Sequence, residues 1–400
     1  MHLATLIRYG SYPFVMVLAA LVAGAVAIAM LPPWPTLPLM AATGIAAVAW
    51  LERVQPYEAA WRRDHGDLRA DVFHGVANFA LLAGTALALH ALRDRVPVTS
   101  VWPTNWNGWL QLLLAGAIID AGLYAMHRLS HCYAWTWRLH AIHHSAERLY
   151  WLNGERRHPL SALLMAGPGL VVSVGLGAPA YVLSAWLGLL SVQLAFQHAN
   201  LDYRVGPLRR WLGVAEVHRW HHKREYEDAQ VNFGEFFMVW DRLFGTFLDR
   251  PDTLRAGDVG LREEVMPTDY LGQLAWPFLA HASDGERAAA VATVFAASLS
   301  DGYAALDAGD LQAAYATFER AHVLGQTRTM RHVCTHIAFW RWARRAGDWR
   351  EALGQLLRIP AALLFTWVWM PRGNTGGARV GALRSLPIPD DLRPYLEPSR

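Results

Sequence analysis

The sequence predicts an all-α protein whose first part crosses a membrane several times and whose last part is a soluble helical module. The 400-residue chain is 54% hydrophobic and only 17% charged, which is apolar for a soluble enzyme of this length. Its uncharged runs reach about the 20 residues that a helix needs to cross a bilayer core. Beyond residue 250 these runs stop, and helical patterns with charged faces follow.

Four apolar runs and a helical hairpin make up the predicted membrane part. The first run is expected to be a transmembrane helix and not a cleaved signal peptide, because it is longer than a signal core and similar runs follow it. The stretch 160–197 has room for two crossings joined at 175–179, where glycines and a proline break a helix. A re-entrant hairpin is the alternative for this stretch. The four preceding runs are 12–31, 37–51, 72–92 and 107–126.

Arginines in a short loop predict the orientation. The loop 52–71 carries four of them and is therefore expected to be cytoplasmic. Counting crossings from this loop brings 127–144 and 218–222 to the same cytoplasmic face. The expected location is the bacterial inner membrane, with a cytoplasmic histidine-rich helical cap and a cytoplasmic C-terminus.

The sequence pattern beyond residue 250, called the tail below, predicts a separate module. We expect a membrane domain over 1–255, a linker over 256–283 and a helical module over 284–400. Within the module, Gly-Asp at 309 recurs at 347, a period of 347 − 309 = 38 residues that is close to that of tetratricopeptide-like (TPR-like) helix pairs. Two units are fewer than a free-standing solenoid needs, so a small TPR-like module of unknown role is expected.

Charge and cysteine content exclude several classes of function. Lys+Arg 36 against Asp+Glu 33 gives a net charge of +3, so no nucleic-acid partner is expected. The two cysteines, Cys132 and Cys334, are far apart and provide neither a disulfide framework nor a thiolate metal site. Any metal must therefore be bound by imidazole.

Histidines gather in one part of the sequence, because ten of the eighteen lie between 127 and 222. They form one His-x3-His and two His-x2-His-His patterns, and positions i, i+3 and i+4 of a helix share a face. Each pattern can therefore aim two or three imidazoles at one point, and the total exceeds what one ion binds. The three boxes are His127 and His131; His140, His143 and His144; and His218, His221 and His222.

Other uses of membrane histidines fit less well. A bis-imidazole haem leaves the His-His doublets unexplained, a zinc protease needs a His-Glu-x-x-His motif that does not occur, and a transporter binds its ions at mid-membrane. Imidazole suits zinc, copper, iron and nickel. A thiolate-free site for two metals beside lipid favours iron, for oxygen activation against a lipid C–H bond.

The ordered boxes resemble the fatty acid hydroxylase / sterol desaturase superfamily. His-Arg at 127, His-Ser-Ala-Glu at 144, Asn-Phe-Gly at 232 and Trp-Asp-Arg-Leu-Phe-Gly-Thr at 240 agree with this resemblance, which covers about residues 10–250. It implies an integral membrane oxidoreductase of lipid metabolism, a monooxygenase or desaturase with a histidine-bound nonheme di-iron centre and dioxygen as co-substrate. Zinc is a possible non-native occupant of such a centre.

The resemblance also implies the residues of the site. The iron ligands it implies are the eight box histidines, joined by His158 and His198, and it implies no catalytic residue beyond the metal centre and no organic cofactor. Asp120 lies at i−7 from His127, on the metal-facing side of its helix, where it is expected to accept a hydrogen bond from a ligand N–H. A polar contact between helices is the alternative. Asn200 and Asp241 are further candidates for orienting ligands.

The expected reaction is hydroxylation, or desaturation, of a lipid C–H bond. Ether-lipid cleavage of the alkylglycerol monooxygenase kind is an alternative, and a non-enzymatic metal-binding membrane protein is an alternative of another class. Because the chain has no Gly-x-Gly-x-x-Gly motif and no cysteine cluster, electrons are expected from an external ferredoxin-like or cytochrome b5-like protein with its reductase.

The tail resembles an uncharacterised bacterial helical domain, in Ala-His-Val-Leu-Gly-Gln at 321 and Arg-Gly-Asn-Thr-Gly-Gly at 372. No activity follows from that resemblance. His322, His332 and His336 admit a second metal site, but ordinary roles as surface imidazoles on a stacked helical pair are expected.

Overall fold

The computed structural model describes residues 3–92, 101–226, 228–262, 266–279, 283–366 and 370–396. The regular secondary structure of these residues is helical, with isolated β-bridges but no strand. The chain divides into two compact units, Met1–Pro277 and Phe278–Arg400. The predicted all-α class, with membrane helices followed by further helices, is confirmed.

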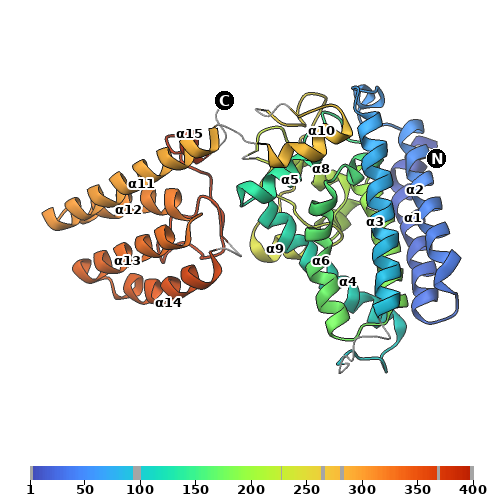
Figure 1. The fold of residues 1–400 in the computed structure, drawn as a ribbon, viewed down its shortest axis with the longest axis horizontal. Coiled ribbons are helices and arrows are strands. Elements are labelled where there is room, and N and C mark those ends of the chain that lie inside the picture. Colours follow the sequence, from blue (N-terminus) through green and yellow to red (C-terminus); the bar gives the residue numbers. More distant parts are fainter. Residues whose placement is uncertain are drawn as a thin grey trace. The chain divides into compact units, whose positions relative to one another are not determined.

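The first unit combines long helices with short ones. Figure 1 shows the long helices running side by side, with the short helices α5, α8 and α10 gathered at one end of them. The long helices are α1 (Leu3–Ala27), α2 (Pro33–Val54), α3 (Leu68–Leu92), α4 (Gly108–Ser130), α6 (Pro159–Gly175) and α7 (Ala180–His198). The short elements are η1 (Ala59–Arg62), α5 (Ala134–His144), η2 (Trp151–Glu155), η3 (Gly206–Arg210), α8 (Ala215–His221), α9 (Val239–Phe244), α10 (Tyr270–Ala275) and η4 (Trp276–Phe278).

The predicted runs 37–51 and 72–92 fall within α2 and α3, and the fourth run, 107–126, begins one residue before α4. The first run, 12–31, was predicted too far, because α1 ends at Ala27. α1 begins nine residues before its predicted start and includes Arg8, whose guanidinium donates to Asp202. α4 continues beyond the predicted 126, so the first histidine box lies on its last turn and just after it. The hairpin breaks where glycine and proline predicted, between α6 and α7, and Gly177 adopts φ +85° there.

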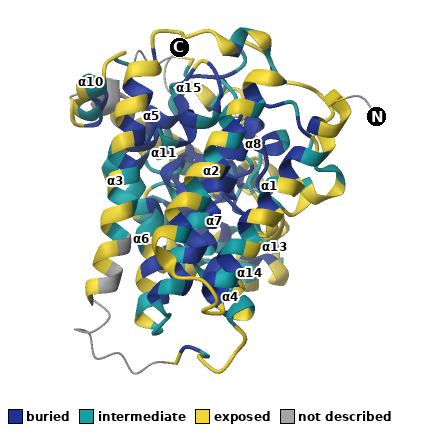
Figure 2. Ribbon diagram, turned by 90° about the vertical axis from the view of Figure 1, so that its right-hand side faces the viewer, coloured by how far each residue is buried: buried dark blue, intermediate teal, exposed yellow. Residues whose placement is uncertain are grey.

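The outer surface of the long helices is apolar, as a bilayer requires. Figure 2 shows exposed residues along α2 and α3, and large hydrophobic side chains such as Leu39, Trp50 and Val76 are more than half exposed. By length and composition, α1, α2, α4 and α7 can each cross a membrane. These features make the first unit an integral membrane protein.

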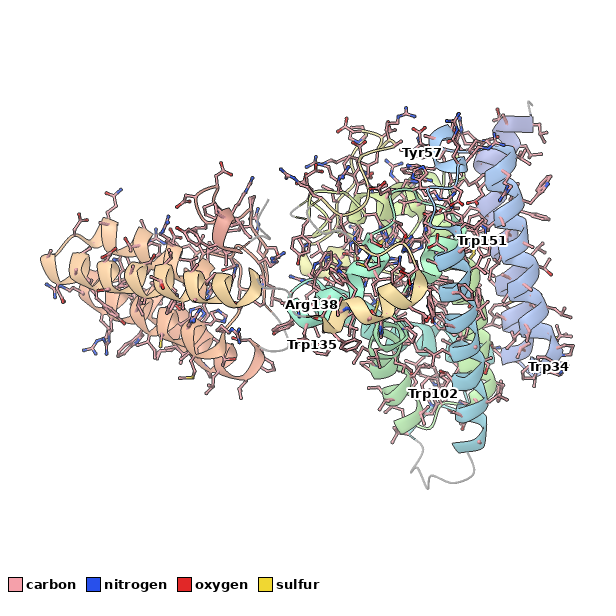
Figure 3. The ribbon with its side chains drawn as sticks, turned by 45° about the horizontal axis from the view of Figure 1, so that its top comes forward. Trp34, Tyr57, Trp102, Trp135, Arg138 and Trp151 are labelled. Carbon is pink, nitrogen blue, oxygen red and sulfur yellow. The ribbon has the colours of Figure 1, made fainter. Side chains whose placement is uncertain are left out.

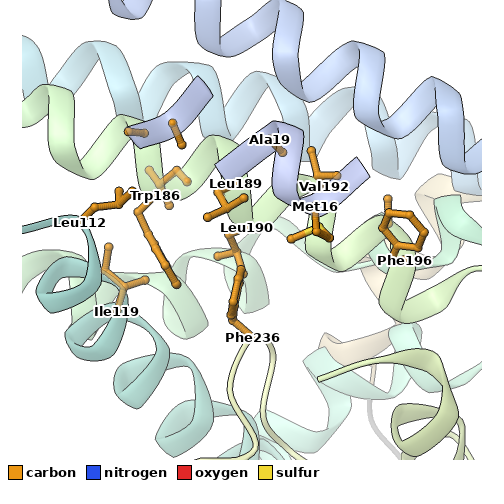
Figure 4. Packing of buried hydrophobic residues seen from close by; sticks show 14 of the residues in the cluster. Met16, Ala19, Leu112, Ile119, Trp186, Leu189, Leu190, Val192, Phe196 and Phe236 are labelled. Atoms are coloured by element: carbon orange, nitrogen blue, oxygen red, sulfur yellow. The ribbon is translucent and has the colours of Figure 1, made fainter. Parts of the chain in front are cut away.

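A buried core holds the long helices together around α7. Trp186 of α7 is 1% exposed and packs on Phe236, with ring centroids 4.7 Å apart (Figure 4). Gly116 of α4 lies against the same indole, where a Cβ would come within 2.5 Å of it. This close approach brings α4, which carries the first histidine box, against α7, which ends in His198.

The second unit is a stack of consecutive helices. They are α11 (Ser283–Ala308), α12 (Leu311–Gly325), α13 (Thr329–Ala346), α14 (Trp349–Phe365) and the short α15 (Arg393–Leu396). The Gly-Asp repeat is the same junction used twice, because Gly309 and Gly347 take positive φ and Asp310 and Asp348 cap the following helices.

One helix of this unit also has the length and hydropathy of a membrane span. It is Ala289–Ala308 of α11, which lies where the sequence analysis expected soluble helices. Its inner face packs on α12, where the rings of Tyr303 and Phe318 meet with centroids 5.3 Å apart. α11 is thus part of the helical stack.

Candidate metal centre

Helix ends place the first two boxes. His127 lies on the last turn of α4, and His131 follows as the residue that ends this helix. The second box occupies the last turn of α5, so that His140 and His144 are one turn apart on the same face. Each of these rings is almost fully buried.

The third box and α7 complete the cluster. His218 and His221 lie on α8, and His222 ends that helix. His198 ends the long core helix α7, where its Nδ1 lies 3.1 Å from the carbonyl oxygen of Leu194. Four separate helices therefore end at one buried point.

Nine histidines form two adjoining groups, each with ligand atoms within 4.8 Å of one another. The first group is His127, His131, His140, His144 and His221, and the second is His143, His198, His218 and His222. The groups touch where the rings of His144 and His222 stack with centroids 4.6 Å apart. Nine of the ten histidines singled out by the sequence are thus brought together.

The distances between ring nitrogens fit ligands of a shared ion better than mutual hydrogen bonds. The Nε2 atom of His144 lies 3.1 Å from the Nε2 atoms of both His131 and His140. In the second group the Nε2 atom of His218 lies 3.1 Å from those of both His198 and His222. Two metal–nitrogen bonds of about 2.1 Å at right angles to tetrahedral angles place their nitrogens roughly 3.0–3.4 Å apart.

Two ligand rings are oriented by backbone carbonyls. His127 donates from Nδ1 to the Phe233 oxygen at 2.8 Å, and His221 donates from Nδ1 to the Val231 oxygen at 2.9 Å. These bonds leave the Nε2 lone pairs facing the cluster, and both Nε2 atoms are buried without a hydrogen-bond partner among the described residues. A hydrogen bond from Nδ1 to a backbone carbonyl is the usual second contact of a histidine that binds a metal through Nε2.

The loop that supplies these carbonyls is itself fixed. Asn232 takes the left-handed φ of +54°, and its side-chain amide donates to the oxygens of Val217 and Leu248. Asp241 accepts from the Phe233 and Gly234 N–H groups at 2.8 and 2.7 Å. Asp241, a predicted orienting residue, thus contacts this loop and not a histidine ring, and the same loop supplies the carbonyl that accepts from His127.

Asp120 does not have the partner that its helical position suggested. Its carboxylate accepts from the N–H groups of Phe236 and Phe237, at 2.8 and 3.1 Å, and from the indole of Trp240. None of these donors is a histidine ring. Asp120 therefore anchors the segment after the 231–234 loop to α4, across more than a hundred residues of sequence.

Asn200 and His158 also lie outside the two groups. Asn200 exchanges two hydrogen bonds with the backbone of Glu58, which joins the loop after α7 to the loop after α2. His158 precedes Pro159 and caps α6, because its Nδ1 accepts from the Leu160 N–H at 3.0 Å. Its Nε2 lies 3.3 Å from the Leu274 oxygen, so both ring nitrogens have backbone contacts.

The sequence analysis did not single out Glu235. This carboxylate is 1% exposed, 3.5 Å from Nδ1 of His127, and its other oxygen lies 3.5 Å from the guanidinium of Arg157. Its position directly after Asn-Phe-Gly at 232–234 is the signal that could have identified it. It is a buried carboxyl group beside the first histidine group.

Burial keeps the rings neutral. Desolvation lowers the pKa of the histidines of the second and third boxes well below the ordinary value, and the neighbouring rings lower it further. A neutral imidazole has a lone pair to give to a metal. The nitrogen donor set, the burial and the unpartnered Nε2 atoms together fit metal binding.

Apolar spans that end at a buried nest of histidines define an integral membrane protein with a histidine-lined site. Residues 112–246 match the family described as "Fatty acid hydroxylase". The chain is also 34% identical, over 244 residues, to an ornithine lipid hydroxylase, OlsE, of Rhizobium tropici, which covers 58% of this chain and 73% of that protein. The chain belongs to the fatty acid hydroxylase family and is an oxidoreductase, which removes the non-enzymatic alternative.

More distant relatives point the same way. The chain is 28% identical to an alkylglycerol monooxygenase of Danio rerio over 44% of this chain and 40% of that protein. It is also 28% identical to a fatty acid hydroxylase, vlmA, of a Lecanicillium species, over 39% of this chain and 47% of that protein. The chain thus spans less than half of these two relatives. No solved structure matches the chain.

The tail has its own family. Residues 289–396 match the family described as "Protein of unknown function (DUF3703)", in agreement with the predicted uncharacterised domain.

Proposed function

We propose that this protein is a nonheme di-iron monooxygenase that hydroxylates a C–H bond of a membrane lipid. The observation that carries the proposal is the pair of adjoining groups of five and four buried histidines at the ends of apolar helices. In this proposal the nine grouped histidines bind the two irons. His158, with both ring nitrogens on the backbone, is the weakest of the ten predicted ligands.

An apolar cavity of about 840 Å³ between α2, α3 and α7 supports a lipid substrate. Leu37 and Ile45 of α2, Phe79 of α3 and Leu187 of α7 are among the residues that line it, so an acyl chain lying there would contact mainly hydrocarbon. Trp151 also lines it and lies apart from Trp34, another lining residue, along the helices in Figure 3.

The Trp151 end of the cavity is linked to the second histidine group through η2. Trp151 belongs to η2, and Gly154 of the same turn lies so close to His198 that a Cβ would come within 3.0 Å of its Nδ1. A chain lying in the cavity would therefore bring its carbons toward the second histidine group.

Bound iron would supply reductive activation of dioxygen and removal of hydrogen from the substrate carbon. The chain's own residues hold the rings, exclude water and control protons around that chemistry. The carbonyls of Phe233 and Val231 fix the tautomers of His127 and His221. Glu235 is buried between His127 and Arg157, with one carboxyl oxygen 3.5 Å from His127 and the other 3.5 Å from Arg157.

We propose a cytoplasmic location for the histidines, in a bacterial inner membrane. Arg53 on the last turn of α2 and Arg62 and Arg63 in the loop after it are exposed. Trp61 of the same loop packs in one cluster with Trp220 beside the third box. The arginine-rich loop and the histidines therefore share a face, which the positive-inside rule assigns to the cytoplasm. An external ferredoxin-like or cytochrome b5-like protein would deliver electrons there.

We also propose that the catalytic domain ends before the linker 256–283 and that the helical module follows it. The separate compactness of Phe278–Arg400 and the family match over 289–396 support a module that begins near the end of this linker, whereas the linker residues up to Pro277 belong to the first compact unit.

Hydroxylation is preferred to desaturation because the matched relatives are named hydroxylases and monooxygenases. An ornithine lipid is the first substrate to test, and an alkylglycerol ether lipid is the second.

The test is incubation of the full chain, loaded with iron in detergent or vesicles, with each lipid, a reductase system and isotopically labelled dioxygen. The proposal expects one labelled oxygen atom in the lipid product. An alkene without label would indicate desaturation, and an aldehyde released from an ether lipid would indicate ether cleavage. Oxygen consumption that leaves all lipid unchanged would contradict the proposal.

A further inference from the structure

The second unit contains a cluster of histidines that the proposed function does not use. His322 lies on α12, and His332 and His336 lie one turn apart on α13. The expectation that these are surface imidazoles is wrong, because they are only 3%, 8% and 3% exposed. Their ring centroids form a nearly equilateral triangle with sides of 4.7, 4.8 and 4.7 Å.

The outer nitrogen of each ring is engaged by an oxygen acceptor. Nδ1 of His322 lies 2.8 Å from the backbone oxygen of Asn374. Nδ1 of His332 lies 2.7 Å from Oγ1 of Thr366, whose own proton goes to the Ala362 oxygen. In both cases the histidine must be the donor, so the proton is on Nδ1 and the lone pair is on Nε2.

The third ring is fixed in the same way. Nδ1 of His336 lies 2.7 Å from Oε1 of Gln355. The amide of Gln355 cannot be turned around, because its nitrogen donates to Glu351 at 2.6 Å and to the Gly376 oxygen at 2.9 Å. Glu351 is 2% exposed, so His336 is connected to a buried carboxylate through the amide of Gln355.

Three Nε2 lone pairs therefore face one another with no proton among them. The Nε2 atoms of His332 and His336 are 3.0 Å apart, and Nε2 of His322 is buried without a hydrogen-bond partner among the described residues. A bound cation removes the repulsion between the three lone pairs.

We propose that His322, His332 and His336 form a second metal site, which binds one zinc-type divalent transition-metal ion through three Nε2 atoms. An all-imidazole set suits zinc and its neighbours, whereas calcium and magnesium need oxygen ligands. Three protein ligands leave a fourth position of a tetrahedral ion for water or another small ligand. All three ligands come from the second unit alone, so the site is independent of the histidines of the membrane unit.

A loop covers this site, and one position of the loop must be glycine. Gly376 adopts φ +84°, and a Cβ there would lie 2.4 Å from Cδ2 of His322. The loop is held by the side chain of Asn374, which donates to the oxygens of Gly381 and Arg384. The backbone oxygen of the same asparagine orients His322, so the loop belongs to the site.

The test uses the full chain, stripped with a chelator and titrated with zinc, in wild type and in a variant with both His332→Ala and His336→Ala. Zinc is counted by mass spectrometry, and His65→Ala, at an exposed histidine of the first unit, is the matched control. The double variant is expected to bind one zinc ion fewer per chain than the wild type, and the control to bind the same number as the wild type.

Hydrogen exchange of the wild type keeps the test independent of whether the variant folds. Zinc is expected to slow exchange in peptides that contain His322, His332, His336 and the 374–377 loop, because the ion stabilises only the folded unit. Equal zinc content in the wild type and a folded double variant, or wild-type exchange in these peptides that zinc does not change, would overturn the site.

Discussion

Asp241→Asn tests whether the loop behind His127 controls the metal centre. The carboxylate is fully buried and accepts three hydrogen bonds, from the N–H groups of Phe233 and Gly234 and from the hydroxyl of Thr246 at 2.6 Å. An asparagine retains one acceptor oxygen, but its NH2 group would face one of the backbone N–H groups. That N–H group would lose its acceptor and face a second donor.

The expected cost follows from those contacts. A hydrogen bond to a charged group contributes about 1.5–3 kcal/mol, and a buried donor without a partner costs about 1–3 kcal/mol, so we expect a loss of roughly 3 kcal/mol. Phe233 supplies both this N–H group and the carbonyl that orients His127. Loss of such a support typically weakens metal binding by about 10–100-fold.

The assay is competition of the reconstituted protein against a chelator of known affinity, together with the thermal midpoint. Asp249→Asn is the control, because its pairing with Arg209 is partly exposed and contributes only about 0–1 kcal/mol. Thr246→Val, which removes one of the three bonds, should give an intermediate effect. Wild-type metal affinity in Asp241→Asn, despite a lowered thermal midpoint, would refute the orienting role of the loop.

Four further outcomes are expected. Burial raises the pKa of the Asp241 carboxyl from 3.8 to about 6. Between these pH values the folded protein holds a proton that the unfolded protein has released, so the contribution of Asp241 to the free energy of unfolding falls by up to ~3 kcal/mol as the pH rises from about 4 to about 6. Asp241→Asn should abolish this slope when the free energy of unfolding is measured against pH. Trp186→Ala should cost about 3–5 kcal/mol and lower the Tm, because it empties the core of the first unit. Ala41→Phe should narrow the apolar cavity and shift activity toward shorter acyl chains, and an unchanged chain-length profile would exclude that cavity as the substrate site. Gly376→Ala should destabilise the second unit by at least about 1–2 kcal/mol through its left-handed backbone, measured as faster hydrogen exchange there.

The sequence predicted the helices because local signals define them. Uncharged runs gave the spans, and the glycines and proline at 175–179 gave the break between α6 and α7. The box spacing also predicted that histidines one turn apart share a face, and the structure brings nine of them together. Their convergence from four helix ends follows from the topology of the spans.

Long-range contacts were beyond local patterns. The partners of Asp120 lie 116 to 120 residues away, so helical spacing predicted its face but not its donors. The left-handed Asn232, whose loop orients two ligands, had no turn signal beyond its residue type. His158 was grouped with the ligands by resemblance, although a residue before a helix-starting proline commonly caps that helix.

The burial of His322, His332 and His336 could not be predicted from the sequence pattern of the helix pair that carries them. His332 and His336 are adjacent on α13 by spacing, but it is the loop around Gly376 and the neighbouring α14 that cover them and supply acceptors. A surface role was the natural expectation without that loop.

The most direct test of the central claim is Mössbauer spectroscopy of the full chain loaded with labelled iron, in the His332→Ala and His336→Ala background that removes the C-terminal site. The two adjoining histidine groups predict two irons per chain with magnetically coupled spectra, and His143→Ala should remove one of them. One iron per chain, or two uncoupled irons that His143→Ala leaves unchanged, would contradict a di-iron centre built from these histidines.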